Sequence, residues 1–314
     1  MKGLHVNWTK PTKVENKINY FYDFSTNSRA EYFTKITAAL SALWWKKLNG
    51  PIKLITDNEG LARYQETGLI EVYDSYDVDL LESYDGNPKL WTGGKIFSLG
   101  IESLPYVFLD NDLIIRSTID KNLYSRDVGF THWEIPKGTE YELKIEDIEY
   151  LGIQSNLSLD LMTLVTNTSF FYVNSKEFQD KMHSEHLLNY KQSSDKITTQ
   201  FWMYTDQIIP GQIIRNLGLS YFTVDHRIHL PYSTQSTNDY KQAVDPNFTE
   251  NLRIGETPMW VTFEKQEPTG IQYEHIWMFK AAIVKHEELY KPRIEFYERE
   301  LKREFPEYAW LCTS

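Results

Sequence analysis

The sequence predicts an α/β protein built on a mostly parallel sheet with helices on both faces. Short apolar runs typical of buried strands alternate with segments whose apolar residues recur at helical spacing. The run at residues 106–109 ends abruptly in two acids, as strands do at the ligand-binding edge of an open sheet. Alternation of strands with helices favours parallel pairing, because crossover helices cover both faces of such a sheet.

The first half of the chain divides into predicted strands and helices in turn. The predicted strands are residues 4–9, 52–56, 70–73 and 106–109, and the predicted helices are about 30–48, 60–67 and 91–103. Gly50-Pro51 is a helix-ending pair, and Asp57-Asn58-Glu59-Gly60 is predicted to form a turn.

The second half has a more mixed pattern. Strands are predicted at 161–166 and 170–173, flanking Asn167-Thr168-Ser169, and helices at 175–188 and within 193–206. Residues 230–270, rich in Pro, Asn, Thr and Gly, are expected to form a long loop or a small sub-domain. A charged helix follows over about 281–305, with Pro292 expected to kink it and an apolar stripe of Ile294, Tyr297, Leu301 and Phe305. The predicted organisation is a main domain over 1–280 and a helical extension over 281–314.

Composition excludes several classes of protein. The net charge of −11, without a long basic stretch, argues against a nucleic-acid partner. Cys312 is the only cysteine, so a disulfide framework or a cysteine-based zinc site is excluded. The sequence shows no signal-peptide core and no apolar run of membrane-spanning length, which predicts a cytoplasmic location. The 9 Trp, 21 Tyr and 16 Phe suit carbohydrate binding, since sugar faces pack on aromatic rings, and suit an ordinary core equally.

The most informative motif is Asp110-Asn111-Asp112, directly after the apolar run Tyr106-Val107-Phe108-Leu109. Two carboxylates at the end of one strand repel each other unless a cation lies between them, and oxygen ligands suit Mg²⁺ or Mn²⁺. Such a cation can bind a diphosphate and stabilise the charge on a departing nucleotide. A surface turn with two solvated acids is the alternative interpretation.

Other enzyme classes fit less well. In haloacid-dehalogenase-like phosphatases a strand also runs into Asp-x-Asp, but that motif continues with Gly-Thr near the start of its domain. Here Leu113-Ile114-Ile115 follow instead. The chain has no Gly-rich phosphate loop and no Gly-x-Ser-x-Gly elbow. His183 and His186, and likewise His226-Arg227-Ile228-His229, are interpreted as surface features.

An ordered set of short segments resembles the GT-A glycosyltransferases, particularly the family-8 and family-32 types, and an uncharacterised related bacterial family. These segments are Val6–Pro11, Leu54–Gly60, Leu90–Lys95, Asp110–Asp112, Asn167–Ser169, Thr205–Gln207 and His275–Lys280. The resemblance implies a GT-A (Rossmann-like) sheet and a catalytic domain that binds a nucleotide-sugar.

The resemblance also implies roles for particular residues. Asp110, Asp112 and His275 would hold the metal ion, Mn²⁺ or Mg²⁺. Asp206 and Gln207 would line the reaction centre, where Asp206 could serve a retaining or an inverting enzyme. The remaining residues would bind the donor: Trp8 and Thr9 the nucleobase, Asn111 the ribose or sugar, Asn167 the sugar, Lys95 the phosphates or sugar, and Lys280 the diphosphate. A core position is the alternative interpretation of Trp8. Two positions depart from the family pattern: Ser169 replaces a Gly, and Lys280 follows His275 by five positions instead of six, without a Gly between them.

The predicted function is transfer of a sugar from a nucleotide-sugar donor, expected to be a UDP-sugar, to a hydroxyl acceptor. The acceptor would be a carbohydrate or glycolipid, as in surface polysaccharide synthesis. A non-catalytic nucleotide- or carbohydrate-binding protein of the same fold is the main alternative, and a nucleotidyltransferase would need a Gly-rich loop that is not found after Thr9. Peripheral membrane contact through the C-terminal helix stays open, although its balanced charges favour a solvated face.

Overall fold

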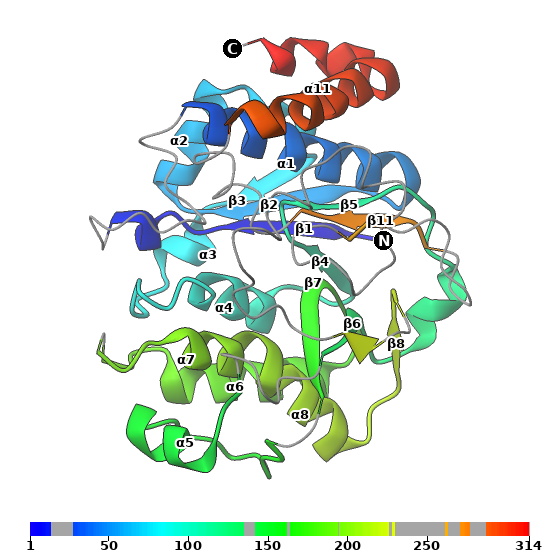
Figure 1. The fold of residues 1–314 in the computed structure, drawn as a ribbon. Coiled ribbons are helices and arrows are strands. Elements are labelled where there is room, and N and C mark those ends of the chain that lie inside the picture. Colours follow the sequence, from blue (N-terminus) through cyan, green and yellow to red (C-terminus); the bar gives the residue numbers. More distant parts are fainter. Residues whose placement is uncertain are drawn as a thin grey trace.

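The computed structural model describes residues 1–13, 28–134, 142–161, 164–193, 195–225, 228–229, 261–262, 271–276 and 287–313. Its centre is an eight-stranded sheet with helices on both faces (Figure 1). The strands lie in the order β3-β2-β1-β4-β7-β6-β8, with β9 also paired to β6. Their bounds are β1 Gly3–Asn7, β2 Ile52–Thr56, β3 Ser75–Asp77, β4 Tyr106–Leu109, β6 Val128–Glu134, β7 Val165–Val173, β8 Tyr221–Thr223 and β9 Ile228–His229.

All but two of the strand pairs in this sheet are parallel; the exceptions are β4–β7 and β6–β7. The predicted class, a mostly parallel sheet flanked by helices, is therefore confirmed. Because β7 runs against its neighbours, its first residues lie at the edge where β1, β4 and β6 end. Residues at the end of β4 and at the start of β7, which are far apart in the sequence, therefore lie at one edge of the sheet.

A second, smaller sheet has the order β10-β11-β5 and is antiparallel. Its strands are β5 Leu113–Ile115, β10 Val261–Thr262 and β11 Tyr273–His275. Since β5 follows β4 after a three-residue turn, this sheet brings a late segment of the chain beside the Asp110–Asp112 motif.

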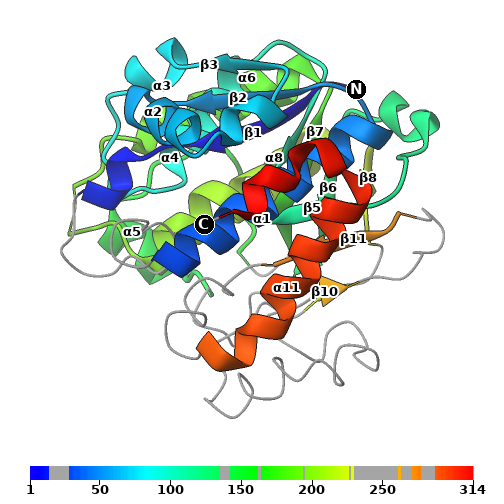
Figure 2. The same ribbon diagram turned by 90° about the horizontal axis from the view of Figure 1, so that it is seen from above.

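Helices cover the two faces of the large sheet in separate groups (Figures 1 and 2). One group comprises α1 Ser28–Leu48, α2 Asn58–Glu66 and the C-terminal helix α11 Glu287–Glu304, which lies against α1. The other includes α4 Gly93–Ile101, α5 Ile145–Leu151, α6 Lys176–Asn189, α7 Thr199–Met203 and α8 Ile209–Leu217. Shorter elements are α3 Asp79–Glu82, the 3-10 turns η1 Lys10–Lys13, η2 Leu69–Val72, η3 Lys121–Ser125 and η5 Pro306–Cys312, and the π-helical turn η4 Tyr204–Ile208.

Each group of helices encloses its own apolar core. The core under α1 and α11 includes Trp45, Val107 and Tyr297, whereas the core under α4 and α6 includes Phe108 and Phe171. Alternate residues of β4 therefore serve opposite cores, as the two-residue period of a strand requires. Fully buried Tyr297 and Leu301 confirm the predicted apolar stripe of the C-terminal helix.

Several predicted elements differ in the structure. Residues 69–72 form the 3-10 turn η2 and not a strand, because Leu69 and Val72, three residues apart, are both buried, and the strand β3 comes slightly later. The predicted turn at Asp57 is the start of α2: the Asp57 carboxylate accepts a hydrogen bond from Gly60 N at 2.9 Å, as an N-cap does.

The region around Asn167 also differs from its prediction. Asn167 lies inside one continuous strand, β7, and not in a loop between two strands. No element was predicted at β6, α5 or α8, although α8 is followed by Gly218, whose left-handed conformation commonly ends a helix.

The prediction that His183 and His186 are surface features is wrong for His186, which is 3% exposed. The buried face of α6 carries residues at helical spacing: Phe178, Met182, His186 and Asn189. This face is buried although it contains polar residues. Ring contacts with Tyr84 and Tyr190, at 5.7 and 6.0 Å between centroids, cover the imidazole of His186.

Residues 230–270, apart from the short strand β10, lie outside the described residues, as do residues 281–286 of the predicted C-terminal helix. Within the described part of the chain, no helix is long and apolar enough to cross a membrane.

Candidate active site

The Asp110–Asp112 motif forms the tight turn between β4 and β5. Asp110 N donates a hydrogen bond to Ser169 O on β7 at 2.8 Å, and Leu113 N donates to Asp110 O at 2.9 Å. The four buried residues of β4 hold the strand between two cores, so the turn emerges at the carboxyl edge of the sheet as predicted.

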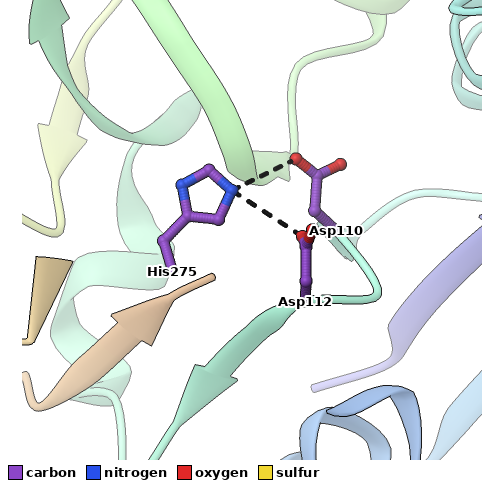
Figure 3. Close-up of side chains that lie close together, drawn as sticks. All are labelled: Asp110, Asp112 and His275. Atoms are coloured by element: carbon purple, nitrogen blue, oxygen red, sulfur yellow. Dashed lines mark ion pairs between the residues drawn. The ribbon is translucent and has the colours of Figure 1, made fainter. Parts of the chain in front are cut away.

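His275 reaches this turn through strand pairing. In the ladder between β5 and β11, His275 lies opposite Leu113, and Ile276 N donates to Asp112 O at 2.9 Å. The imidazole Nε2 lies 3.7 Å from Asp112 Oδ1 and 3.9 Å from Asp110 Oδ2 (Figure 3). Burial lowers the pKa of His275 to about 4 despite the opposing effect of Asp112, so the ring is neutral at neutral pH, the form that binds metals.

These three side chains fit a divalent cation. One ligand atom from each lies within 4.8 Å of the other two, although the three groups are too far apart to hydrogen-bond directly. Two carboxylate oxygens and one neutral imidazole suit Mn²⁺, while Mg²⁺ would use mainly the carboxylates. Across the described residues, no other group of three such side chains is close enough to hold a metal ion.

Lys95 approaches the Asp110 carboxylate at Oδ1, whereas His275 approaches it at Oδ2. Lys95 extends from α4, is 8% exposed, and its Nζ is 2.9 Å from Asp206 Oδ1 and 3.6 Å from Asp110 Oδ1. It also donates to Thr168 Oγ1 at 3.0 Å and lies 4.5 Å from the centre of the Phe108 ring. Burial alone would lower the pKa of Lys95, but Asp110 and Asp206 outweigh it and raise the pKa, so the side chain is charged.

Asp206 and Gln207 lie on the π-helical turn η4, a rare form that is often found at functional sites. Asp206 accepts a hydrogen bond from Thr168 Oγ1 at 3.0 Å in addition to its ion pair with Lys95. The side-chain oxygen of Gln207 is buried, and the described residues offer it no hydrogen-bond partner. A buried amide oxygen without a partner costs free energy, so a ligand group that donates to it would bind favourably.

Asn167 takes part in a polar network with residues that the sequence analysis missed. Its amide Nδ2 donates to Glu134 Oε1 at 2.8 Å, and its Oδ1 accepts from Ser169 Oγ at 2.7 Å. Glu134 Oε1 also lies 3.0 Å from His132 Nε2, and both residues of this pair are buried. His132 lies opposite Asn167 in the ladder between β6 and β7, so this pair lies at the same edge of the sheet as Asn167. The sequence feature that could have identified His132 and Glu134 is their spacing, because residues two apart on a strand share one face.

A small, open pocket adjoins the Asp110–Asp112 turn. Its lining, which includes Asn111, comes mainly from α1, α2 and the end of β1: Asn7, Thr9, Glu31, Thr34, Lys35, Ala38, Arg63, Tyr64, Thr67, Leu69 and Asn111. Thr9 is held there by Asp57, whose carboxylate accepts from Thr9 N at 2.9 Å and from Thr9 Oγ1 at 2.8 Å. The side-chain oxygen of Asn111 is buried and has no partner among the described residues.

Trp8 lies on the opposite side of the strand end from this pocket. It packs in the core under α4, with its ring edge-on to Tyr84 at 5.0 Å and with Gly94 directly against it. Lys280 lies outside the described residues, as do His226 and Arg227. The structure therefore brings together Asp110, Asp112, His275, Lys95 and Asp206, whereas Trp8 is part of the core.

Comparisons with known proteins give distant similarities. A protein-family model described as "Family of unknown function (DUF6734)" matches residues 1–154, and no curated protein matches the sequence. Among solved structures, the chain is similar to the galactosyltransferase LgtC in complex with donor and acceptor sugar analogues (13% identity, TM-score 0.36, 86% of each chain covered). It is also similar to mouse xyloside xylosyltransferase 1 (11% identity, TM-score 0.37, covering 72% of this chain and 85% of that one). At these identities and TM-scores the likeness carries no conclusion about activity.

Proposed function

We propose that this chain is a metal-dependent glycosyltransferase that takes its sugar from a nucleotide-sugar donor. The observation that carries the proposal is the cluster of Asp110, Asp112 and His275 at the carboxyl edge of the sheet, beside an open pocket. A divalent cation held by these three residues would bind a diphosphate and stabilise its charge as it leaves. Ligands of open α/β sheets bind at this edge.

In this proposal the pocket receives the nucleoside. Thr9 and Asn111 supply polar atoms to its lining, Asn111 between the two proposed carboxylate ligands, and residues of α1 and α2 supply most of the rest. The unpaired side-chain oxygen of Asn111 suits a ribose hydroxyl as its donor. A uridine nucleotide is the first to test, as the resemblance to family-8 glycosyltransferases suggests.

The sugar and its acceptor would lie on the Lys95 side of Asp110. There the charged Lys95 would add to the positive potential felt by the departing diphosphate, and Asp206 keeps that lysine in place. Gln207 would accept a hydrogen bond at the reaction centre, since its carbonyl oxygen is unpaired within the described residues. The acceptor would be a hydroxyl of a carbohydrate or glycolipid.

One observation favours a second candidate, a nucleotide-binding protein that does not transfer sugar. The side chain of Asn167, proposed to bind the donor sugar, is paired within the protein through Glu134 and Ser169. A binding protein would retain the metal and nucleoside sites without turning over the donor. Release of UDP from UDP-sugars in the presence of Mn²⁺, followed by chromatography, separates the two candidates.

The test of the proposal is calorimetric titration of UDP into the protein with and without Mn²⁺. We expect binding only with Mn²⁺, and Asp112→Asn should weaken it at least about tenfold, or 1.4 kcal/mol, because one charged ligand of the cation is lost. Asp85→Asn is the control, since Asp85 is an exposed acid paired with Lys191 at the surface.

Two results would contradict the proposal. Equal UDP binding without metal would refute the role of Asp110, Asp112 and His275. Failure of UDP, GDP and the other nucleoside diphosphates to bind in the presence of Mn²⁺ would refute the glycosyltransferase proposal itself.

A further inference from the structure

A cluster of charged side chains, with two buried glutamates and two partly buried arginines, joins the C-terminal helix α11 to the strand that carries His275. It has four members, called the Glu274 cluster below: Arg116, Glu274, Arg293 and Glu300.

Glu274 is the centre of the cluster and the chain neighbour of His275. It is 1% exposed, and its carboxylate pairs with Arg116 at 2.7 Å, pairs with Arg293, and accepts a hydrogen bond from Tyr297 OH at 2.5 Å.

Arg116 connects the cluster to the other metal-binding segment. It follows β5, which begins just after Asp112, and its backbone N donates to Gln272 O at 2.8 Å. Its guanidinium binds Glu300 of α11 through Nε at 2.6 Å and Nη2 at 2.8 Å. Glu300 in turn accepts from Trp44 Nε1 of α1 at 2.9 Å. The cluster therefore ties the segments on both sides of the metal site to two helices.

This arrangement determines the register of a very short strand. β11 has three residues and pairs with β5 and β10 only, so its backbone hydrogen bonds hold its register weakly. A slip by one residue would exchange the faces of Glu274 and His275. It would also remove the Glu274 carboxylate from Arg116 and Arg293, which is costly because Glu274 is buried and an unpaired buried charge is strongly destabilising.

We infer that the Glu274 cluster positions His275 for metal binding, and that docking of α11 and metal affinity are thereby coupled. The inference rests on the proposed metal site. Because such coupling is reciprocal, bound metal also stabilises the docked α11. Arg293 and Glu300 act here as positioning residues, since they contact Glu274 and Arg116 and not the metal ligands.

The test uses Mn²⁺ itself as the probe, with the full chain at a temperature where every variant is folded. Arg293→Met should weaken Mn²⁺ binding about tenfold, the usual size of the effect when a residue supporting a metal ligand is lost. Nitrogen hyperfine coupling in the electron spin echo spectrum of bound Mn²⁺ should decrease in parallel, because His275 then ligates a smaller fraction of the ions. Arg293→Lys should restore part of both signals.

Glu304→Gln is the matched control. It removes the ion pair between α11 and Lys47 of α1, at 3.0 Å, without touching β11. We expect this control to retain the wild-type affinity and nitrogen coupling. Arg293→Met with unchanged affinity and coupling would overturn the inference, and so would equal losses in both variants. Wild-type protein that binds no Mn²⁺ would refute the proposed function and the inference with it, whereas the first two outcomes leave the metal site intact.

Discussion

Lys95 keeps a positive charge inside the protein because two carboxylates surround it. Without Asp110 and Asp206, burial of its ammonium group would favour the neutral form, and with them the pKa rises. The same contacts leave Asp110 with a cation on one side and His275 on the other. The proposed metal site therefore has a fixed positive group beside it, on the side where the departing phosphates would lie.

Two buried histidines have a lowered pKa, in contrast to the raised pKa of Lys95. Burial lowers the pKa of His186 to about 3, from an ordinary value of 6.5, and the same is true of His5. Between these two pH values the unfolded chain binds protons that the folded chain does not. The free energy of unfolding therefore falls as the pH decreases, by about 1.4 kcal/mol per pH unit for each such histidine.

We predict that His186→Leu removes one of these contributions. The slope of the free energy of unfolding against pH, measured by urea denaturation between about pH 6 and pH 4, should become smaller by about 1.4 kcal/mol per unit. His183→Leu is the comparison: this half-buried neighbour has a pKa that burial also lowers, but its greater exposure should make the change smaller. An unchanged slope for His186→Leu would show that His186 is protonated in the folded protein.

At the scale of elements, α4 approaches the end of β1 without an intervening side chain. A Cβ atom added at Gly94 would lie 2.8 Å from Trp8 Cβ and Cγ, which is closer than carbon atoms approach. The close contact sets how near the helix comes to the sheet edge. Lys95 is the next residue of α4, so the contact between Gly94 and Trp8 also determines how far the Lys95 side chain reaches toward Asp110.

Gly94→Ala should lower the free energy of unfolding by about 1–3 kcal/mol, the usual cost of overpacking, measured by urea denaturation. Gly211→Ala in α8 should have the opposite sign and stabilise by about 0.5–1 kcal/mol, because an added Cβ there has no neighbour nearer than 3.4 Å and alanine favours a helix. Equal stability of Gly94→Ala and the wild type would mean that α4 can move away from β1 freely.

At the scale of the whole molecule, the C-terminal segment belongs to the core under α1. Tyr297 packs on Phe33 with 5.7 Å between ring centroids, and Phe305 packs on Trp44 at 5.4 Å. The ionic contacts of Arg116 with Glu300 lie in the same interface. Removing α11 would therefore expose apolar surface and leave the partly buried Arg116 without Glu300.

We predict that a chain ending at residue 286 does not fold to a stable monomer. Exposed aromatic rings and unpaired charge should produce aggregation in size-exclusion chromatography and loss of the cooperative thermal transition. The full chain measured in parallel is the control. A soluble monomer that melts near the temperature of the full chain would instead support a separable extension over 281–314.

The sequence by itself determined the fold class and the place of the Asp110–Asp112 turn. The apolar residues of β2 and β4 and the helical period of α1 depend on local spacing, which is visible in the chain. Asp110 and Asp112 could be placed at the sheet edge because a buried strand ends directly before them.

Only the tertiary structure decided which distant residues lie beside Asp110 and Asp112. His275 reaches Asp112 through a ladder between strands more than 150 residues apart, and no local pattern encodes that pairing. Burial of His186, the core position of Trp8, and the network of His132 and Glu134 with Asn167 also depend on packing between elements. Local spacing determines which face a side chain takes on its own helix or strand, whereas the neighbour that covers that face is set by long-range contacts.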